Sequence, residues 1–433
     1  MVKSSIFLIF MTGLTLLGQE SLTLEESIRR AWSDQTGLRA GAAMVERSKA
    51  EAEALRALRL PTLTAAVGIT RTDEPMMAFG TKLNQARIAQ MDFLPSALNH
   101  PDPITGAGAT LTLSQPLYAG GRLDAAYRAG SAMAAAEGAS QAYRRQQVAL
   151  AVVQAYFGTQ MAAQGVKYAE DTLRQGQETE RFVQSRVEQG LMLKSEGERT
   201  KAFRAQSEAG VVEAKQRLAS ARSALVLLMG SETAPESLST PVAGVVQELP
   251  SQAGDRGDLE AARLQAEAAR EGLTAQRGLL KPEVGLTLTA GTARYKWNEG
   301  GNWSSASVGA KWTFSFAEQK RVQAARASVR AAELNQKWQQ QQAGREVDEA
   351  RRAVETAQAR MTYAKVAVEA SESVRTIRTA RHREGLLPLV EVLDAETGLS
   401  GARTLLLNSQ LEWRISRAQL ALALGQPIEN VKE

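Results

Sequence analysis

An internal repeat constrains the fold of this chain more than any other sequence feature. Residues 38–61 match residues 259–282, and both segments begin with Leu and end with Pro. Farther along, "QGLMLKSE", which ends at Glu196, matches "EGLLPLVE", which ends at Glu391, at an offset of 195 residues. Because the two halves carry the same elements in the same order, we expect two structural repeats.

Each half also contains a long heptad pattern, in which small or apolar residues recur in alternating steps of three and four. The positions are Val152, Ala155, Thr159, Ala162, Val166, Ala169 and Leu173 in the first half, and Val347, Ala350, Val354, Ala357, Met361, Ala364 and Val368 in the second. This period is typical of helices that wind around neighbouring helices. Residues 121–189 lack Pro, so they predict a helical rod on the order of 100 Å long.

Four short segments alternate between apolar residues and small polar residues. This period of two predicts β-strands over about residues 62–71, 107–118, 283–293 and 304–316. Their lengths suit strands that cross an outer membrane at a tilt. The alternative is a soluble pair of hairpins packed on a helical core, because soluble strands alternate in the same way.

The number of strands predicts an oligomer. The smallest known membrane barrels have about eight strands, so four cannot close one. An open edge in lipid would leave backbone groups unpaired, at a cost of several kcal/mol each. Two copies would supply eight strands and three copies twelve, and the residues alone leave both open.

The remaining segments complete the predicted domain organisation. Residues 1–18 resemble a secretory signal peptide, with Lys3 before an apolar stretch. The repeats occupy residues 19–230 and 259–425, separated by an irregular segment at 231–258 and followed by a tail at 426–433. With no cysteine in the chain, disulfides are excluded, and a lipid anchor on an N-terminal cysteine is not expected.

Several classes of function lose support from what the sequence lacks. The 52 basic and 47 acidic residues are dispersed, so nucleic-acid binding is not predicted. The chain has only two histidines and no phosphate-binding loop or hydrolase motif. We therefore expect no catalytic residues, no cofactor, no metal site and no enzymatic activity.

The segment "SQPLYAGGR" (114–122), together with "EGLLPLVEVLDAE" (384–396), resembles the TolC-like outer-membrane efflux family over essentially the whole mature chain. The resemblance implies a mainly α-helical protein with a transmembrane β part. Three protomers would share a twelve-stranded β-barrel and a long periplasmic barrel of antiparallel coiled-coil helices. It also implies an outer-membrane location in a Gram-negative-type cell. The partners that the resemblance implies for this chain are two further copies of it, outer-membrane lipid, a periplasmic adaptor and an inner-membrane transporter of the RND or ABC type.

The resemblance leaves the cargo open. The chain is expected to be the passive exit duct of a tripartite efflux pump, and an alternative is the channel of a type I protein secretion system. An alternative of another class is a periplasmic coiled-coil scaffold that never enters the membrane. Co-isolation with membranes and ion conductance would separate the scaffold from the channels.

Three acidic residues are candidates for a periplasmic entrance. Glu196, Glu391 and Asp394 match positions at which the family places carboxylates. Threefold symmetry would turn each one into a ring of charges that attracts cations. The alternative is that acids in the first turn of a helix complement the helix dipole.

The turns that precede these acids form the predicted tip. Gly190–Leu191 and Gly385–Leu386 interrupt the long helices, and in the family such turns contact the adaptor. The alternative, compatible with the first, is that the glycines only end helices.

A gate network is predicted next to the second turn. His382 takes a position where the family often has a tyrosine that helps to hold the closed state. Arg186, Arg381 and Arg383 are candidates for a gate-linking arginine that the chain lacks at Leu387. Taken alone, His382 is expected to be a solvated surface residue; within a gate network it would make opening sensitive to pH near 6.5.

Overall fold

A computed structural model describes residues 21–233, 235, 237–241, 254–296 and 298–428. The predicted signal peptide, residues 234, 236 and 242–253 of the predicted irregular segment at 231–258, and residues 429–433 of the tail lie outside the described residues. The chain forms two compact units, each built from several stretches of the sequence. We call them the helical unit (Met1–Ala42, Gln141–Gly257 and Gln341–Glu433) and the sheet unit (Ala43–Ser140 and Asp258–Gln340).

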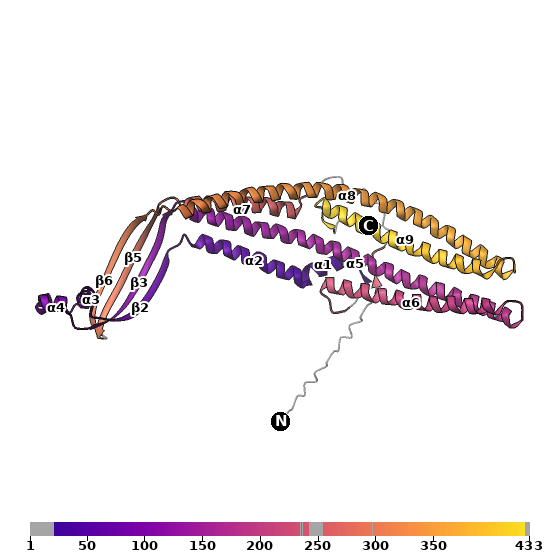
Figure 1. Ribbon diagram of the computed structural model, residues 1–433, viewed down its shortest axis with the longest axis horizontal. Helices are drawn as coiled ribbons and strands as arrows, with labels where there is room; N and C mark the ends of the chain where they lie inside the picture. Colours follow the sequence, from indigo (N-terminus) through magenta and orange to yellow (C-terminus); the bar gives the residue numbers. More distant parts are fainter. Residues whose placement is uncertain (1–20, 234, 236, 242–253, 297, 429–433) are drawn as a thin grey trace, which may run out of the picture. The chain divides into compact units, whose positions relative to one another are not determined.

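The two predicted repeats are present as two runs of equivalent elements (Figure 1). The first run is α2 (Thr36–Ala57), β2 (Thr62–Thr72), β3 (Ile104–Ala119), α5 (Arg122–Glu188) and α6 (Lys194–Met229). The second run is α7 (Gly257–Gly278), β5 (Glu283–Lys296), β6 (Glu299–Lys311), α8 (Phe316–Arg383) and α9 (Leu389–Ala423). Helices α5 and α8 contain 67 and 68 residues, as the heptad pattern predicts. Within the described part of the chain, no helix is both long enough and apolar enough to cross a membrane.

Buried small and apolar side chains give the helical unit its core. Helix α1 (Leu24–Asp34) packs on α5, α6 and α9, and strand β1 (Ser21–Leu22) pairs in parallel with β4 (Ser237–Leu238). Tyr156 of α5 is fully buried, and its hydroxyl donates to the carbonyl of Leu22 at 2.7 Å and accepts from the amide of Thr240 at 2.9 Å. One side chain thereby ties β1 and the segment directly after β4 to the longest helix of the first repeat.

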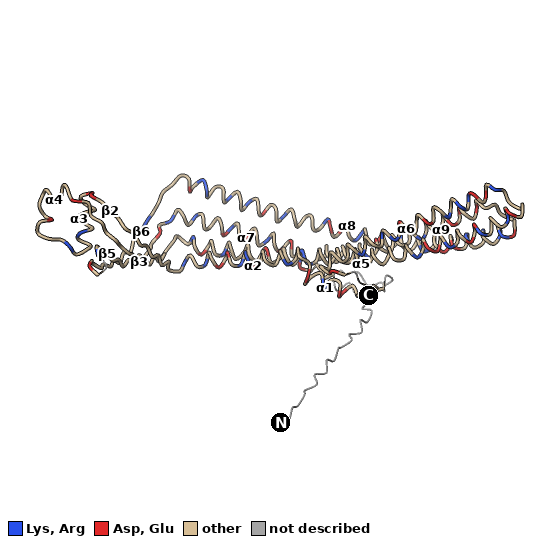
Figure 2. The backbone as a smooth tube through the Cα atoms, turned by 90° about the horizontal axis from the view of Figure 1, so that it is seen from below, with Lys and Arg blue, Asp and Glu red and all other residues tan. Residues whose placement is uncertain are grey.

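The sheet unit contains an antiparallel sheet in the order β2-β3-β5-β6. Its cross-strand rows alternate between two kinds of side chain. The row Leu63–Leu113–Leu288–Ala306 lies on what we call the aliphatic face. The next row, Thr64–Thr112–Thr289–Ser305, lies on the opposite, hydroxyl face. Charged residues occur only near the strand ends (Figure 2).

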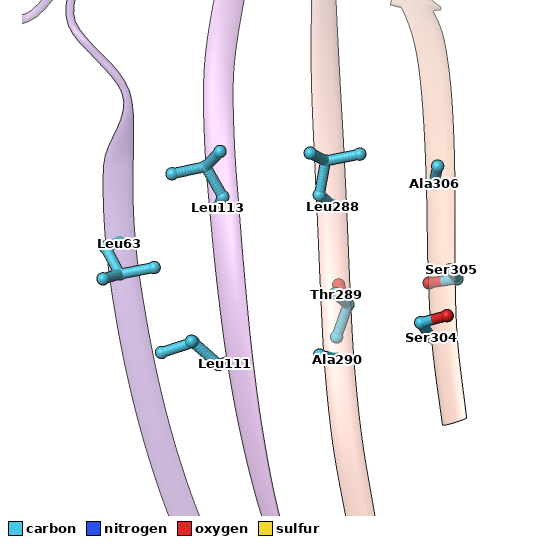
Figure 3. Close-up of a pocket in the computed structure, with 9 residues that line it drawn as sticks. All are labelled: Leu63, Leu111, Leu113, Leu288, Thr289, Ala290, Ser304, Ser305 and Ala306. Carbon is cyan, nitrogen blue, oxygen red and sulfur yellow. The ribbon is translucent and has the colours of Figure 1, made fainter. Parts of the chain in front are cut away.

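No helix or strand in the described part of the chain covers the aliphatic face. Leu63 is 62% exposed and Val67 is 86% exposed, and Figure 3 shows Leu63, Leu113 and Leu288 on adjacent strands. Within the described residues, β2 and β6 each pair with a neighbour on one side only. The protomer therefore presents an apolar sheet surface and two open sheet edges.

The predicted strand over residues 304–316 is wrong at both ends, since β6 runs from Glu299 to Lys311. Lys311 pairs with Glu283, the first residue of β5. Pro282 directly precedes Glu283 and has no backbone N–H to donate to a further pair. The alternation continues beyond Lys311, but no partner strand remains to pair with it. Ser315 instead accepts from the amide of Ala317 at 3.2 Å, at the start of α8.

The long connection at 72–106 has structure of its own. It contains helix α3 (Pro75–Asn84), the 3-10 helix η1 (Gln90–Phe93) and helix α4 (Pro95–Asn99), and it joins β2 to β3. The equivalent connection in the second repeat is only residues 297–298. The two repeats therefore differ most at this end of the sheet.

Candidate functional site

Two turns in the helical unit connect the long helices, and they have the same backbone geometry. Gly190 lies in the α5–α6 turn with φ 74°, and Gly385 lies in the α8–α9 turn with φ 79°. After each glycine, the next amide donates to the carbonyl five residues earlier, at 2.8 and 2.9 Å. A Cβ at either glycine would meet no atom within 4 Å, so the backbone conformation, not lack of space, favours glycine there.

The residue after each glycine is an exposed leucine. Leu191 is 62% exposed and Leu386 is 70% exposed, and Leu193 in the first turn is 72% exposed. Pro388 directly precedes α9 as its N-cap residue, one position earlier than a first-turn proline. The two turns thus present apolar side chains to the surroundings of the protomer.

The three predicted entrance carboxylates have three different surroundings. Glu391 forms an ion pair with Arg378 of α8 at 2.8 Å, and the same guanidinium donates to the Glu391 carbonyl at 3.2 Å. Asp394 is exposed and has no ion pair within the described part of the chain. Oε2 of Glu196 is buried without a hydrogen-bond partner among the described residues. Among the residues that the structure describes, therefore, only Glu391 of the three has a neutralising partner.

His382 is buried, which corrects the expectation of a solvated surface histidine. Its side chain is 5% exposed, and Nδ1 donates to the carbonyl of Leu387 at 2.7 Å, across the α8–α9 turn. Its ring meets the ring of Phe182 edge-on at 5.9 Å. Continued past Val368 in the same steps, the α8 heptad reaches residues 371, 375, 378 and 382, so His382 lies on the packed stripe of the helix, and the chain that returns after Gly385 contacts it through Leu387.

The three candidate arginines are not gathered at one place. The Arg186 guanidinium lies 5.4 Å from the centre of the Phe182 ring, so Arg186 and His382 contact the same aromatic side chain. Arg381 and Arg383 are exposed. The structure thus brings Arg186 and His382 together around Phe182 of α5 and leaves the other two at the surface.

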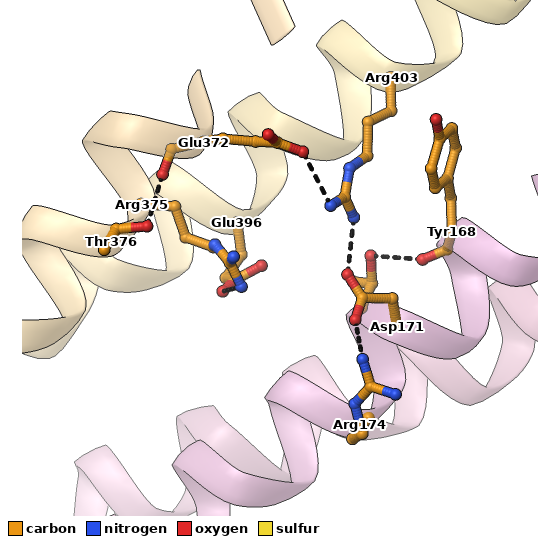
Figure 4. Close-up of polar contacts among 9 residues, drawn as sticks. Tyr168, Asp171, Arg174, Glu372, Arg375, Thr376, Glu396 and Arg403 are labelled. Atoms are coloured by element: carbon orange, nitrogen blue, oxygen red, sulfur yellow. Dashed lines mark hydrogen bonds and ion pairs between the residues drawn. The ribbon is translucent and has the colours of Figure 1, made fainter. Parts of the chain in front are cut away.

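A second polar group, which we call the Arg403 cluster, connects three helices (Figure 4). Arg403 of α9 donates to Asp171 of α5 at 2.8 Å and to Glu372 of α8 at 3.1 Å. Its guanidinium also lies 4.8 Å from the centre of the Tyr168 ring. Two further contacts complete the cluster: Arg174 bonds to Asp171, and Arg375 lies 3.9 Å from Glu396.

The pKa values of Asp171 and Glu396 in the cluster are shifted in opposite directions. Burial acts to raise the pKa of Asp171, but the hydrogen bond from Arg403 and the charges of Arg403 and Arg174 outweigh it and hold that pKa below its usual value. Burial also raises the pKa of Glu396, which is 5% exposed, and here the arginine charges are too weak to reverse the effect. As the pH falls, Glu396 therefore loses its charge before Asp171 does.

The Arg403 cluster was not predicted from the sequence, although charged residues at heptad positions of α9 could have indicated it. On α9, positions 389, 392, 396, 399 and 403 form one heptad stripe, and Leu389, Val392 and Leu399 are buried in it. Glu396 and Arg403 occupy the remaining positions of the same stripe. Charged residues at core positions of a coiled coil require partners on the facing helices, and this spacing could have indicated them.

The long helices with tip turns and the amphipathic four-stranded sheet match known proteins. The family model described as outer membrane efflux protein matches residues 28–231 and 249–426. A comparison with curated proteins finds no match.

Several solved structures share the fold at low identity. VceC of Vibrio cholerae is 21% identical with a TM-score of 0.79, over 94% of this chain and 96% of that chain. CmeC of Campylobacter jejuni is 16% identical with a TM-score of 0.81, over 95% and 87%. The open state of MtrE of Neisseria gonorrhoeae is 20% identical with a TM-score of 0.78, over 94% and 89%. The chain therefore belongs to the outer membrane efflux protein family, whose members are channels and not enzymes.

Proposed function

We propose that three copies of this protein form the outer-membrane duct of a tripartite export system. The duct receives small molecules from an inner-membrane transporter of the RND or ABC type through a periplasmic adaptor. The observation that carries this proposal is the sheet, which has an exposed aliphatic face, a hydroxyl face and two open edges.

One arrangement accounts for the exposed aliphatic face, the hydroxyl face and the two open edges of the sheet. An apolar face with Val67 86% exposed is costly in water but suits hydrocarbon. In hydrocarbon, unpaired backbone groups along β2 and β6 are unfavourable, so β6 of one protomer must pair with β2 of the next. Three protomers give a closed cylinder of twelve strands, with the hydroxyl face around a lumen wide enough for a pore. The helical unit then lies in the periplasm, and no lipid anchor is needed.

Membrane insertion and conductance test this function. The mature protein is expected in the outer-membrane fraction, as a trimer band that disappears when the gel sample is heated, and the purified trimer should conduct ions across a planar bilayer. A water-soluble monomer without conductance would contradict the proposal and favour a periplasmic scaffold. Loss of resistance to small toxic compounds on deletion supports efflux, whereas loss of a secreted protein would point to type I secretion.

The surroundings of the three acids refine the proposed entrance. Because Arg378 neutralises Glu391, the net negative charge on α9 at the entrance comes from Asp394, which has no partner within the described residues. We place the cation-attracting ring at Asp394, three charges per trimer, with Glu196 as a second contributor. A narrow entrance of low dielectric strengthens such a field.

Ion selectivity in a planar bilayer tests the ring. Asp394→Asn is expected to shift the reversal potential in a salt gradient toward that of a non-selective pore, because it removes the unpaired charge. Glu355→Gln is the matched control, since Glu355 is an exposed acid of α8 that lies roughly 40 Å along the helix from the turn. Equal shifts for both variants, or none for either, would remove the ring from the proposal.

A further inference from the structure

Helix α3 covers the hydroxyl face of the sheet rather than its edge or its aliphatic face. Two glycines show the close approach. A Cβ at Gly301 of β6 would lie 2.3 Å from the backbone oxygen of Asn84, and a Cβ at Gly106 of β3 would lie 2.8 Å from Cγ2 of Thr81. Neither strand could hold a side chain at these positions without moving α3.

The strand register identifies the face. On β3, Gly106 is separated by an even number of residues from Thr112, and on β6, Gly301 is separated by an even number from Ser305. Thr112 and Ser305 lie in the same cross-strand row of the hydroxyl face, through Thr289. Since side chains alternate along a strand, both glycines open toward that same face.

One buried side chain anchors the connection to the strand ends. Gln85, 1% exposed, directly follows α3, and its Nε2 donates to the carbonyls of Thr105 at 3.0 Å and Arg294 at 3.2 Å. Thr105 belongs to β3 and Arg294 to β5, so the amide spans two adjacent strands. Ala78 of α3 and Ile104 of β3 are also buried, at 1% and 6% exposed.

The outer side of the same connection is apolar and exposed. Met76 is 81% exposed, Met91 is 74% exposed and Phe93 is 60% exposed. An ion pair between Lys82 and Asp92 at 2.8 Å holds η1 to α3, so these side chains belong to an ordered structure. Figure 1 shows α3 at the end of the sheet that lies away from α7.

We propose that the connection from Pro75 to Asn99 is a constriction at the outer mouth of the pore, held in place by Gln85. The inference rests on the proposed function, because only in a closed barrel does the hydroxyl face line a lumen. Each protomer then places one α3 inside the mouth, and flexible methionine side chains face the passage. The exit, as well as the periplasmic entrance, limits which molecules pass.

Thiol labelling in intact cells tests the constriction, because the chain has no cysteine of its own. The Thr112→Cys variant places a thiol on the hydroxyl face, about 20 Å along the strand from Gly106. Cells that carry this variant are treated with a small charged thiosulfonate. In a separate experiment they are treated with a maleimide attached to a polyethylene glycol that is too wide for a constricted mouth. Val67→Cys on the aliphatic face is the control that lipid should protect from both reagents.

The same labelling is repeated with the constriction weakened or removed. One background carries Gln85→Ala, another replaces residues 75–99 by a Gly/Ser linker, and a matched control carries Gln90→Ala, which changes an exposed glutamine of the same connection. Trimer bands on unheated gels show which variants assemble. We expect the small reagent to label the Thr112→Cys thiol in every background. The wide reagent should react with the same thiol roughly tenfold faster in the Gln85→Ala background and faster still in the linker background. Its rate should not change in the Gln90→Ala background.

The outcomes separate the two proposals. If the small reagent never labels the Thr112→Cys thiol, the hydroxyl face does not line water, and the proposed pore and the constriction both fail. If the small reagent labels it and the wide reagent reacts equally with and without residues 75–99, the pore stands and the constriction is refuted. If only the linker variant reacts faster, the constriction holds and the anchoring role of Gln85 is overturned.

Discussion

Replacing Arg403 by Gln is the most direct test of how the helical unit is held together. The Arg403 side chain is 11% exposed and bonds to Asp171 and Glu372, whose side chains are 23% and 46% exposed. Truncating one partner of a fully buried ion pair costs about 3–5 kcal/mol, and an exposed pair contributes less than about 1 kcal/mol. Because the two carboxylates are partly solvated, we expect a loss of about 2 kcal/mol.

The loss should be local, so amide hydrogen exchange is the appropriate assay. About 2 kcal/mol corresponds to roughly 30-fold faster exchange of the amides that open when α5, α8 and α9 separate. Arg360→Gln is the matched control, since Arg360 joins α8 to Glu412 of α9 at 3.0 Å through side chains that are 60% and 48% exposed. It should accelerate exchange only a few-fold.

Equal changes of exchange in both variants, or a native exchange rate in the three helices near Arg403 after Arg403→Gln, would show that Arg403 does not hold these helices together. The pH dependence gives a second check. Because the pKa of Asp171 is lowered in the folded protein, the stability that it contributes is present above its unfolded pKa of about 3.9 and is lost as the pH falls through the folded value. Arg403→Gln should remove that acid-dependent part.

Three further predictions concern other parts of the helical unit. Tyr156→Phe removes the two hydrogen bonds that join α5 to β1 and to the segment after β4, so the unfolding free energy should fall by about 1–3 kcal/mol, measured by denaturant titration. Glu396→Gln should leave stability at pH 4 unchanged but raise it at pH 7, in thermal melts at both pH values. The raised pKa of Glu396 contributes stability below its unfolded pKa, about 4.3, and this is lost as the pH rises through the folded value. Gly385→Arg should abolish export without loss of trimers, whereas Gly344→Arg, at an open position of α8 without a positive φ, should preserve export. Equal export by these two variants would argue against a role for the tip turn.

Local patterns made much of the fold predictable. The heptad period indicated α5 and α8, and alternation indicated four strands, because side-chain direction repeats with a fixed period in each kind of element. The breaks at Gly190 and Gly385 were visible because few residues other than glycine adopt a positive φ readily. The end of β6 was not predictable in this way, since a strand ends where its partner ends.

The candidate site was only partly predictable. The sequence placed Glu391 and His382 next to a turn, and the continued heptad of α8 passes through Arg378 and His382, but which residues they contact depends on how α8 packs against its neighbours. The Arg403 cluster joins residues that are up to 232 positions apart in the chain. Periodicity reports which face of an element a residue occupies, and it does not report which residue of another element lies opposite.

The two repeats, the long helices and the amphipathic strands could be inferred from residue spacing along the chain, and so could the expectation of more than one copy. Three features became clear from the folded molecule: the long connection after β2 folds over the hydroxyl face, Arg378 neutralises Glu391, and Arg403 connects three helices. Such contacts depend on the packing of whole elements, because that packing brings together side chains from distant parts of the chain.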